Sequence, residues 1–268
     1  MKKKLSTAYL VLIFGILYIP ILTLIFFSFN SANSTAVFTG FSFRWYKELF
    51  KSPDTFTALR NTLILAISSA SIATVIGTAA AEGIYKMKSK FLKATINSVT
   101  NIPMMNPDIV TGMSMMLFFV VVAGILRISY DDMGFVAMLI AHITFCLPYV
   151  ILSVLPRITE FGDSLSEAAL DLGCTPIQAF FKVKLPNIMH GVVSGFVMAF
   201  TLSLDDFVIS YFVGSSKFQT LPLLIYSMTK KKVTPDMYAL STLIIIAIFT
   251  LLFISNVKAG KKEGGKKR

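Results

Sequence analysis

Six blocks of the sequence consist almost entirely of apolar residues, and polar residues gather between them. They run over residues 7–29, 61–85, 92–126, 134–155, 188–212 and 236–257. Each block is long enough to supply the roughly 20 residues that a helix needs to cross a bilayer. None alternates strictly between apolar and polar positions, as a barrel strand would, and backbone groups in lipid must pair within their own element. The pattern therefore predicts an all-α integral membrane protein with six transmembrane helices.

The composition favours a membrane protein over a soluble one. Hydrophobic residues make up 55% of the chain and charged residues 15%, whereas an average soluble domain is about 45–50% apolar and about 25% charged. We expect three regions along the 268 residues. These are a first helix with an extracytoplasmic segment over 1–57, a transmembrane domain over 58–257, and a basic tail over 258–268.

The distribution of positive charge predicts the orientation in the membrane. Most of the 25 lysines and arginines fall in segments that lie inside if both termini are cytoplasmic, as the positive-inside rule requires. We therefore expect a multi-pass protein of the cell (inner) membrane. The formal net charge of +11 favours contact with anionic lipid headgroups over nucleic acid. In the tail, Lys267 stands where a phosphate-binding loop needs Ser or Thr, so we expect no ATPase site and no enzyme activity in this chain.

The longest connection, residues 156–187, reads as two short helices rather than a linker. Ser164 or Ser166 can cap the first helix. Gly173 ends it, because glycine enters the left-handed conformation at little cost. The pattern predicts a helical hairpin on the cytoplasmic side.

The second helix of this hairpin has its own start and stop signals. Thr175 can cap it, with Pro176 at the first position where a missing N–H costs nothing. Pro186 is expected to stop it before the next span. An apolar patch on such a hairpin usually marks a protein contact. Its members here are Ala168, Leu172, Ile177, Phe180 and Phe181.

The same loop carries a family signature: Glu-Ala-Ala, three residues, Gly, nine residues, Ile, any residue, Leu-Pro. The matching residues are Glu167, Ala168, Ala169, Gly173, Leu185 and Pro186. Val183 replaces the isoleucine, and Lys184 takes the position open to any residue. The chain thus resembles the permease subunits of type I ABC importers. That resemblance implies a hairpin that couples to a separate ATPase, which would hold ATP and Mg²⁺, while this chain holds no cofactor.

A more extended similarity is to the second permease subunit of spermidine/putrescine importers. The segments that carry it are YIPILTLIFFSFNS, NPDIV, AHITFCLPYV, EAALDLG and FTLSLDDFVISYF. The resemblance implies a polyamine permease forming half of the membrane pathway. Its partners would be a second permease of similar fold, a pair of ATPase subunits and an extracytoplasmic substrate-binding protein.

Three aspartates lie inside apolar blocks, where an ionised carboxylate costs about 2.5–3.5 kcal/mol. Pro103 and Pro107 interrupt the third block, so Asp108 sits where freed backbone groups can line a cavity. Counted along straight helices, Asp108 and Asp205 lie at about the same depth, roughly 24–25 Å from the cytoplasmic end. We expect these two and Asp206 to form a cation site in the pathway. The alternative is that they cap helix breaks or face a partner subunit.

The fourth block offers a complementary face, because His142, Phe145 and Tyr149 are spaced three and four residues apart. Aromatic rings attract alkylammonium groups, so carboxylates with aromatics suit a polyamine and repel an anion. We take His142 and Tyr149 as pathway candidates. His142 can instead be an interhelical hydrogen-bonding residue and the rings simple packing, while Glu82 lies near the cytoplasmic interface.

Two outer segments are candidates for contacts outside the bilayer core. The stretch 40–50, which contains Trp45, suits a helix at the membrane–water interface. Lys230, Lys231 and Lys232 can attract a binding protein.

Other functions remain as alternatives at this point. A secondary transporter often has paired broken helices in two inverted repeats, whereas this sequence indicates one interrupted helix. A membrane enzyme is disfavoured because the sequence has no metal-ligand cluster or nucleophile–base pair. An importer of another small cationic or amino-acid-like solute also fits the signature loop.

Overall fold

The computed structural model describes residues 2–33, 37–230, 235–246 and 249–250. In these ranges the chain is almost entirely helical and contains no β-strand, only isolated bridges such as Asn30 with Phe41. Five of the described helices are long and apolar enough to cross a membrane. The chain forms two compact units, Met1–Phe56 with Ile225–Arg268, and Thr57–Leu224.

The first unit begins with α1 (Lys2–Phe27), in which Tyr9–Phe27, within the first apolar block, is long and apolar enough to cross a membrane. Asn30 then orders the following loop, because its Nδ2 donates to the Val37 carbonyl at 2.7 Å and its Oδ1 accepts from the Thr39 N–H at 3.0 Å. The same unit contains α2 (Arg44–Lys51) and the helix Pro235–Ile246.

Residues 40–50 contain the helix α2, and its tryptophan packs inside the protein. Trp45 is only 5% exposed, and its Nε1 donates to the Asn30 carbonyl at 2.7 Å. The exposed rings of this segment are those of Phe41, Phe43 and Phe50. Trp45 faces inward because an indole N–H that finds a buried carbonyl can bury the rest of the ring at little cost.

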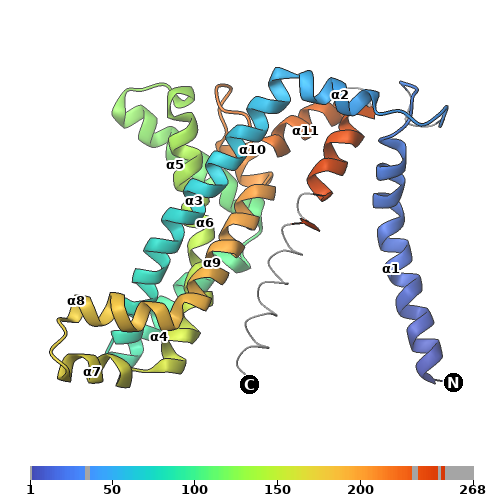
Figure 1. Cartoon of the computed structure of the whole chain (residues 1–268). Coiled ribbons are helices and arrows are strands. Elements are labelled where there is room, and N and C mark those ends of the chain that lie inside the picture. The colour runs from blue at the N-terminus through green and yellow to red at the C-terminus, as the bar shows by residue number, and fades with distance from the viewer. Residues whose placement is uncertain (1, 34–36, 231–234, 247–248, 251–268) are drawn as a thin grey trace. The chain divides into compact units, whose positions relative to one another are not determined.

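The second unit holds most of the membrane-spanning helices (Figure 1). Its helices are α3 (Pro53–Lys86, which starts in the first unit), α4 (Lys90–Met105), α5 (Asp108–Leu126), α6 (Tyr130–Phe161), α7 (Ser164–Asp171), α8 (Pro176–Ala179), a π-helical turn η1 (Phe180–Lys184), α9 (Leu185–Asp205) and α10 (Val208–Val213). α11 (Leu221–Lys230) leads back into the first unit.

Small residues on α9 let it pack closely on α6. Gly191, Gly195, Ala199 and Ser203 recur every four residues and are all buried. A Cβ added to Gly191 would lie 2.8 Å from the Ser153 carbonyl oxygen, so only glycine allows this approach. Close backbone contact through small residues four apart is a common way for membrane helices to associate.

The third block is interrupted as the prolines predict, and it forms two separate helices. α4 ends at Met105, Asn106 is extended, and α5 starts at Asp108 after Pro107. Proline disfavours the helical conformation of the residue before it, so the chain breaks at Asn106. The straight-helix depth given above for Asp108 therefore does not hold.

A second break interrupts the fifth block, which agrees with the alternative that the aspartates there cap a helix break. α9 ends at Asp205, Asp206 is extended, and the short α10 follows. The expectation of one interrupted helix was therefore wrong. In the sixth block, Pro235–Ile246 is helical. The structure does not describe most of residues 247–257, nor Lys231, Lys232 and the tail 258–268.

The hairpin in residues 156–187 is present as α7, α8 and η1, with the expected turn between its helices. Gly173 has φ +86°, its N–H donates to the Leu170 carbonyl, and the Cys174 N–H donates to the Ala169 carbonyl, which is the Schellman pattern. Thr175 caps α8 in a capping box with Gln178, and Pro176 is at the first position.

Two details of the hairpin differ from expectation. Asp163, not Ser164 or Ser166, occupies the N-cap position of α7, and it makes no side-chain capping bond. Pro186 does not stop the second helix, because α8, η1 and α9 run on continuously. The π-helical turn directly before Pro186 widens the helix where proline lacks an N–H, so the helix passes through instead of ending.

Candidate functional site

A chain of buried polar groups crosses the second unit between α3, α9, α6 and α10. Ser69 Oγ lies 2.9 Å from Ser203 Oγ, which lies 2.7 Å from His142 Nδ1. The other ring nitrogen, Nε2, lies 3.2 Å from Ser210 Oγ and 3.5 Å from Asp206 Oδ2. His142 is fully buried, so both of its nitrogens are satisfied by protein groups. The arrangement matches the alternative of an interhelical hydrogen-bonding histidine.

Asp206 is held at the break between α9 and α10. Its Oδ2 accepts from the Ser210 N–H at 2.8 Å and its Oδ1 from the Ile209 N–H at 3.3 Å. Its side chain is 7% exposed. The carboxylate therefore caps the first turn of α10, where it satisfies N–H groups that would otherwise lack partners.

Asp205 and Asp108 differ from Asp206 because both are exposed. Asp108 is the first residue of α5. Tyr149 is partly exposed, and its ring centroid lies 5.8 Å from that of the buried Phe145. Of the candidate pathway residues, the structure thus brings His142 to Asp206.

The signature residues lie on the hairpin, which with α4 forms one end of the second unit (Figure 1). Glu167 and Ala168 are exposed, whereas Ala169 is buried. Beside them, Leu172, Ile177 and Phe181 are 87%, 71% and 60% exposed. Leu185 is partly buried and Pro186 exposed. The hairpin therefore presents an apolar knob of the kind that docks on another protein.

A buried lysine lies at the base of the hairpin. Lys184 is 5% exposed, and its Nζ donates to Glu82 Oε1 at 2.9 Å and to Asp163 Oδ1 at 3.5 Å. From the sequence alone, Lys184 is expected only to carry positive charge on the cytoplasmic side, and Glu82 is expected only to lie near the cytoplasmic interface of the membrane. Their pairing across 102 residues leaves no local pattern, although a lysine within the apolar Val183–Leu185 surroundings was a usable signal. The serines of the buried chain were also missed, since single serines are common in spans.

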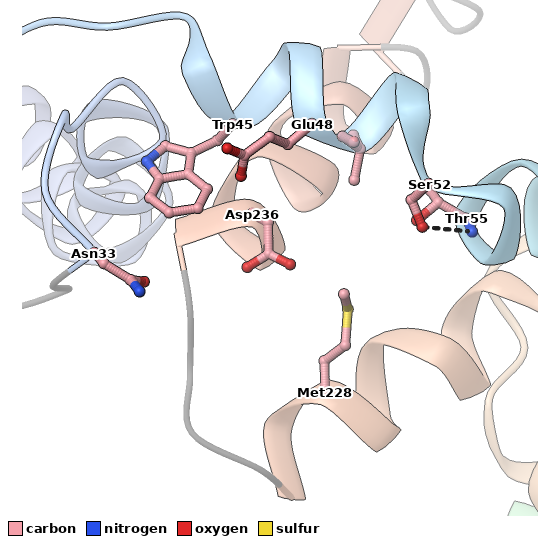
Figure 2. A pocket seen from close by; sticks show the side chains of 8 residues that line it. Asn33, Trp45, Glu48, Ser52, Thr55, Met228 and Asp236 are labelled. Atoms are coloured by element: carbon pink, nitrogen blue, oxygen red, sulfur yellow. Dashed lines mark hydrogen bonds between the residues drawn. The ribbon is translucent and has the colours of Figure 1, made fainter.

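The first unit contains a cleft with acidic lining that the sequence did not indicate. It has a volume of about 240 Å³ and is lined by Asn33, Trp45, Glu48, Leu49, Ser52, Thr55, Met228 and Asp236 (Figure 2). Asp236 points into it, and its Oδ1 is buried with no hydrogen-bond partner among the described residues. Glu48 is already paired with Arg44 at 2.7 Å. The cleft is smaller than the roughly 300–1,000 Å³ typical of small-molecule sites, so it has room for water or a single small group.

Comparison with known proteins identifies relatives along nearly the whole chain. The chain is 38% identical over 246 residues to the putrescine transport system permease protein PotI of Escherichia coli K12, covering 92% of this chain and 87% of that protein. It is 36% identical over 259 residues to the spermidine/putrescine transport system permease protein PotC of Haemophilus influenzae, covering 97% and 98%. Against PotC of E. coli K12 it is 36% identical over 263 residues, covering 98% and 97%.

The fold is also that of solved importer permeases. A bacterial ABC transporter involved in the import of the acidic polysaccharide alginate matches with a TM-score of 0.74, 17% identity, and coverage of 98% of this chain and 96% of that one. A second structure of an alginate ABC transporter, bound to a pentasaccharide-loaded periplasmic protein, matches with a TM-score of 0.70 and 15% identity over 94% and 91%. At this identity the match concerns the fold. The model of one family matches residues 73–259, and this chain belongs to that family, the inner membrane components of binding-protein-dependent transport systems.

Proposed function

We propose that this chain is a permease subunit of an ATP-driven importer for polyamines such as spermidine and putrescine. The observation that carries the proposal is 36–38% identity, over 92–98% of this chain, to permeases of putrescine and spermidine/putrescine systems. Family membership also removes the secondary transporter as an alternative, despite the two broken helices. The chain forms half of the pathway, and a second permease of similar fold forms the other half.

In this proposal the hairpin couples the chain to a separate ATPase. The exposed knob of Leu172, Ile177 and Phe181 would seat on that ATPase, with the signature residues Glu167, Ala168, Ala169, Gly173, Leu185 and Pro186 shaping and anchoring it. ATP and Mg²⁺ bind to the partner, and this chain has no catalytic role. Among the described residues no group of three or more His, Cys, Asp or Glu side chains is placed to hold a metal.

The substrate pathway is proposed to use Asp108, Tyr149 and Asp205. Asp108 and Asp205 are exposed and Tyr149 is partly exposed, and Asp205 lies at the break in the fifth span. A carboxylate can replace part of the hydration that an ammonium loses, and a ring can lie along the methylenes. His142 and Asp206 are assigned an indirect role, because their polar atoms are engaged with each other and with α10.

The proposed topology places both termini and the hairpin in the cytoplasm. The excess of lysine and arginine on that side supports it. A substrate-binding protein then docks on the opposite face and delivers the polyamine.

The proposal is tested by purifying the chain gently from its native membrane and identifying what comes with it. We expect a second permease, an ABC ATPase and a binding protein, and mass spectrometry of the captured binding protein should detect a polyamine. A binding protein loaded with an amino acid or a sugar would reject the polyamine assignment. Loss of the ATPase from a Glu167→Lys variant, with the second permease retained, would support the coupling surface.

A further inference from the structure

Lys184 places a full positive charge inside the protein at the base of the hairpin. Its side chain is 5% exposed and that of its partner Glu82 is 13% exposed, with 2.9 Å between Nζ and Oε1. The Nζ also lies 4.7 Å from the centre of the Tyr85 ring. A buried ammonium is costly unless it is paired. The hairpin therefore cannot leave this position without either breaking the pair or carrying Glu82 with it.

The groups around this ammonium come from two elements, and Lys184 itself belongs to a third. Glu82 and Tyr85 are in the last turns of α3, and Asp163 is at the N-cap of α7, 3.5 Å from Nζ. Lys184 itself ends η1 and continues directly into α9. One side chain thus joins the end of a long span, the start of the hairpin and the start of another span.

The pair is not a requirement of the signature loop. Lys184 stands at the position that the signature leaves open to any residue, between Val183 and Leu185. Without Glu82 the buried ammonium of Lys184 would keep only its longer contact with Asp163, at 3.5 Å. Glu82 also forms an ion pair with Lys86, with 3.0 Å between Oε1 and Nζ. That lysine is 66% exposed and lies on the same helix as Glu82, so this second pair does not connect two elements.

We propose that Lys184 is a positioning residue that ties the hairpin to the end of α3 through Glu82, so that a movement of the hairpin is passed to α3 as well as to α9. The proposal rests on the proposed function, in which the hairpin receives the movement of the ATPase. Without the tie the hairpin moves only α6 and α9, the helices to which it is joined along the chain, and ATP hydrolysis is only partly converted into transport.

The test uses the complete importer in lipid vesicles and measures polyamine molecules taken up per ATP hydrolysed. Glu82→Gln and Lys184→Gln should each lower this ratio at least about five-fold, because each breaks the buried ion pair that joins α3 to η1. The double Gln variant should be no worse than the worse single variant, since both act through one interaction. Lys86→Gln, which removes a charge from the same carboxylate but no link between elements, should stay within about two-fold of wild type.

A ratio within about two-fold of wild type in both single variants would overturn the proposal, as would single effects that multiply in the double variant. If the Gln variants do not assemble, Glu82→Asp decides: it keeps the charge but shortens the reach, and we expect assembly with a lowered ratio. Assembly with a normal ratio would overturn the tie.

Gly173→Val separates this proposal from the proposed function. A β-branched residue is strained at the φ of +86° found there, so the variant distorts the hairpin turn without touching Lys184. If it lowers the ratio while the Gln variants do not, only the tie fails. If it leaves the ratio normal, the hairpin is not the coupling element.

Discussion

Asp206 and Asp108 both lie in apolar blocks, but their surroundings predict different effects of neutralisation on the stability of the protein. In Asp206→Asn one carboxylate oxygen that accepts a backbone N–H is replaced by a donor. We expect a loss of about 1–3 kcal/mol of stability from the unpaired buried group. Asp108→Asn changes an exposed side chain, so its stability should stay within about 0.5 kcal/mol of wild type. Thermal unfolding in detergent measures both, and equal stability of the two variants would contradict the capping role of Asp206.

The exposed aspartates should affect transport rather than stability. Asp108→Asn should reduce polyamine uptake while substrate-stimulated ATPase activity and assembly persist, because a charge is lost from the pathway and no structural bond is. Asp205→Asn should behave similarly. Uptake into vesicles at matched protein amounts checks this, and normal flux in the Asp108→Asn, Asp205→Asn double variant would remove these two acids from the pathway.

At the scale of elements, the contact of α9 with α6 should be sensitive to one methyl group. Gly191→Ala places a Cβ 2.8 Å from both the Ser153 carbonyl oxygen and Arg157 Cγ, and such overpacking costs about 1–3 kcal/mol. Gly124→Ala on α5 is the matched control, because its Cβ meets nothing within 4 Å. The control should be neutral or slightly stabilising, as alanine favours helix. Two variants with the same melting temperature would contradict the close packing.

The hydrophobic pattern predicted the spans well and their interruptions only in part. The break before Asp108 has a local cause in Pro107, and Gly173 and Thr175 shape the hairpin by local geometry, so the sequence reveals them. The break at Asp206 is only one of the alternatives that the sequence offers for the two aspartates, and the contact of Asp206 with the His142 ring forms only in the folded chain. Lys184 finds Glu82 only in the folded chain, and no periodicity reports such a pair.

For the whole molecule, the proposed orientation predicts which loops a membrane-impermeant reagent reaches. In a variant without Cys146 and Cys174, Ser216→Cys should react with an impermeant maleimide in intact cells. Ser89→Cys should react only after permeabilisation, although both positions are exposed in the protein. The reverse pattern would place the hairpin outside the cell and contradict coupling to a cytoplasmic ATPase.

The central proposal for this chain is that it carries polyamines when ATP is hydrolysed by a partner. The direct measurement is uptake of radiolabelled putrescine and spermidine by vesicles that contain the purified importer, with its loaded binding protein on one side and ATP with Mg²⁺ on the other. We expect ATP-dependent accumulation that excess unlabelled polyamine suppresses and an anionic solute does not. Accumulation that proceeds without ATP, or ATP-dependent uptake of another solute with none of either polyamine, would contradict it.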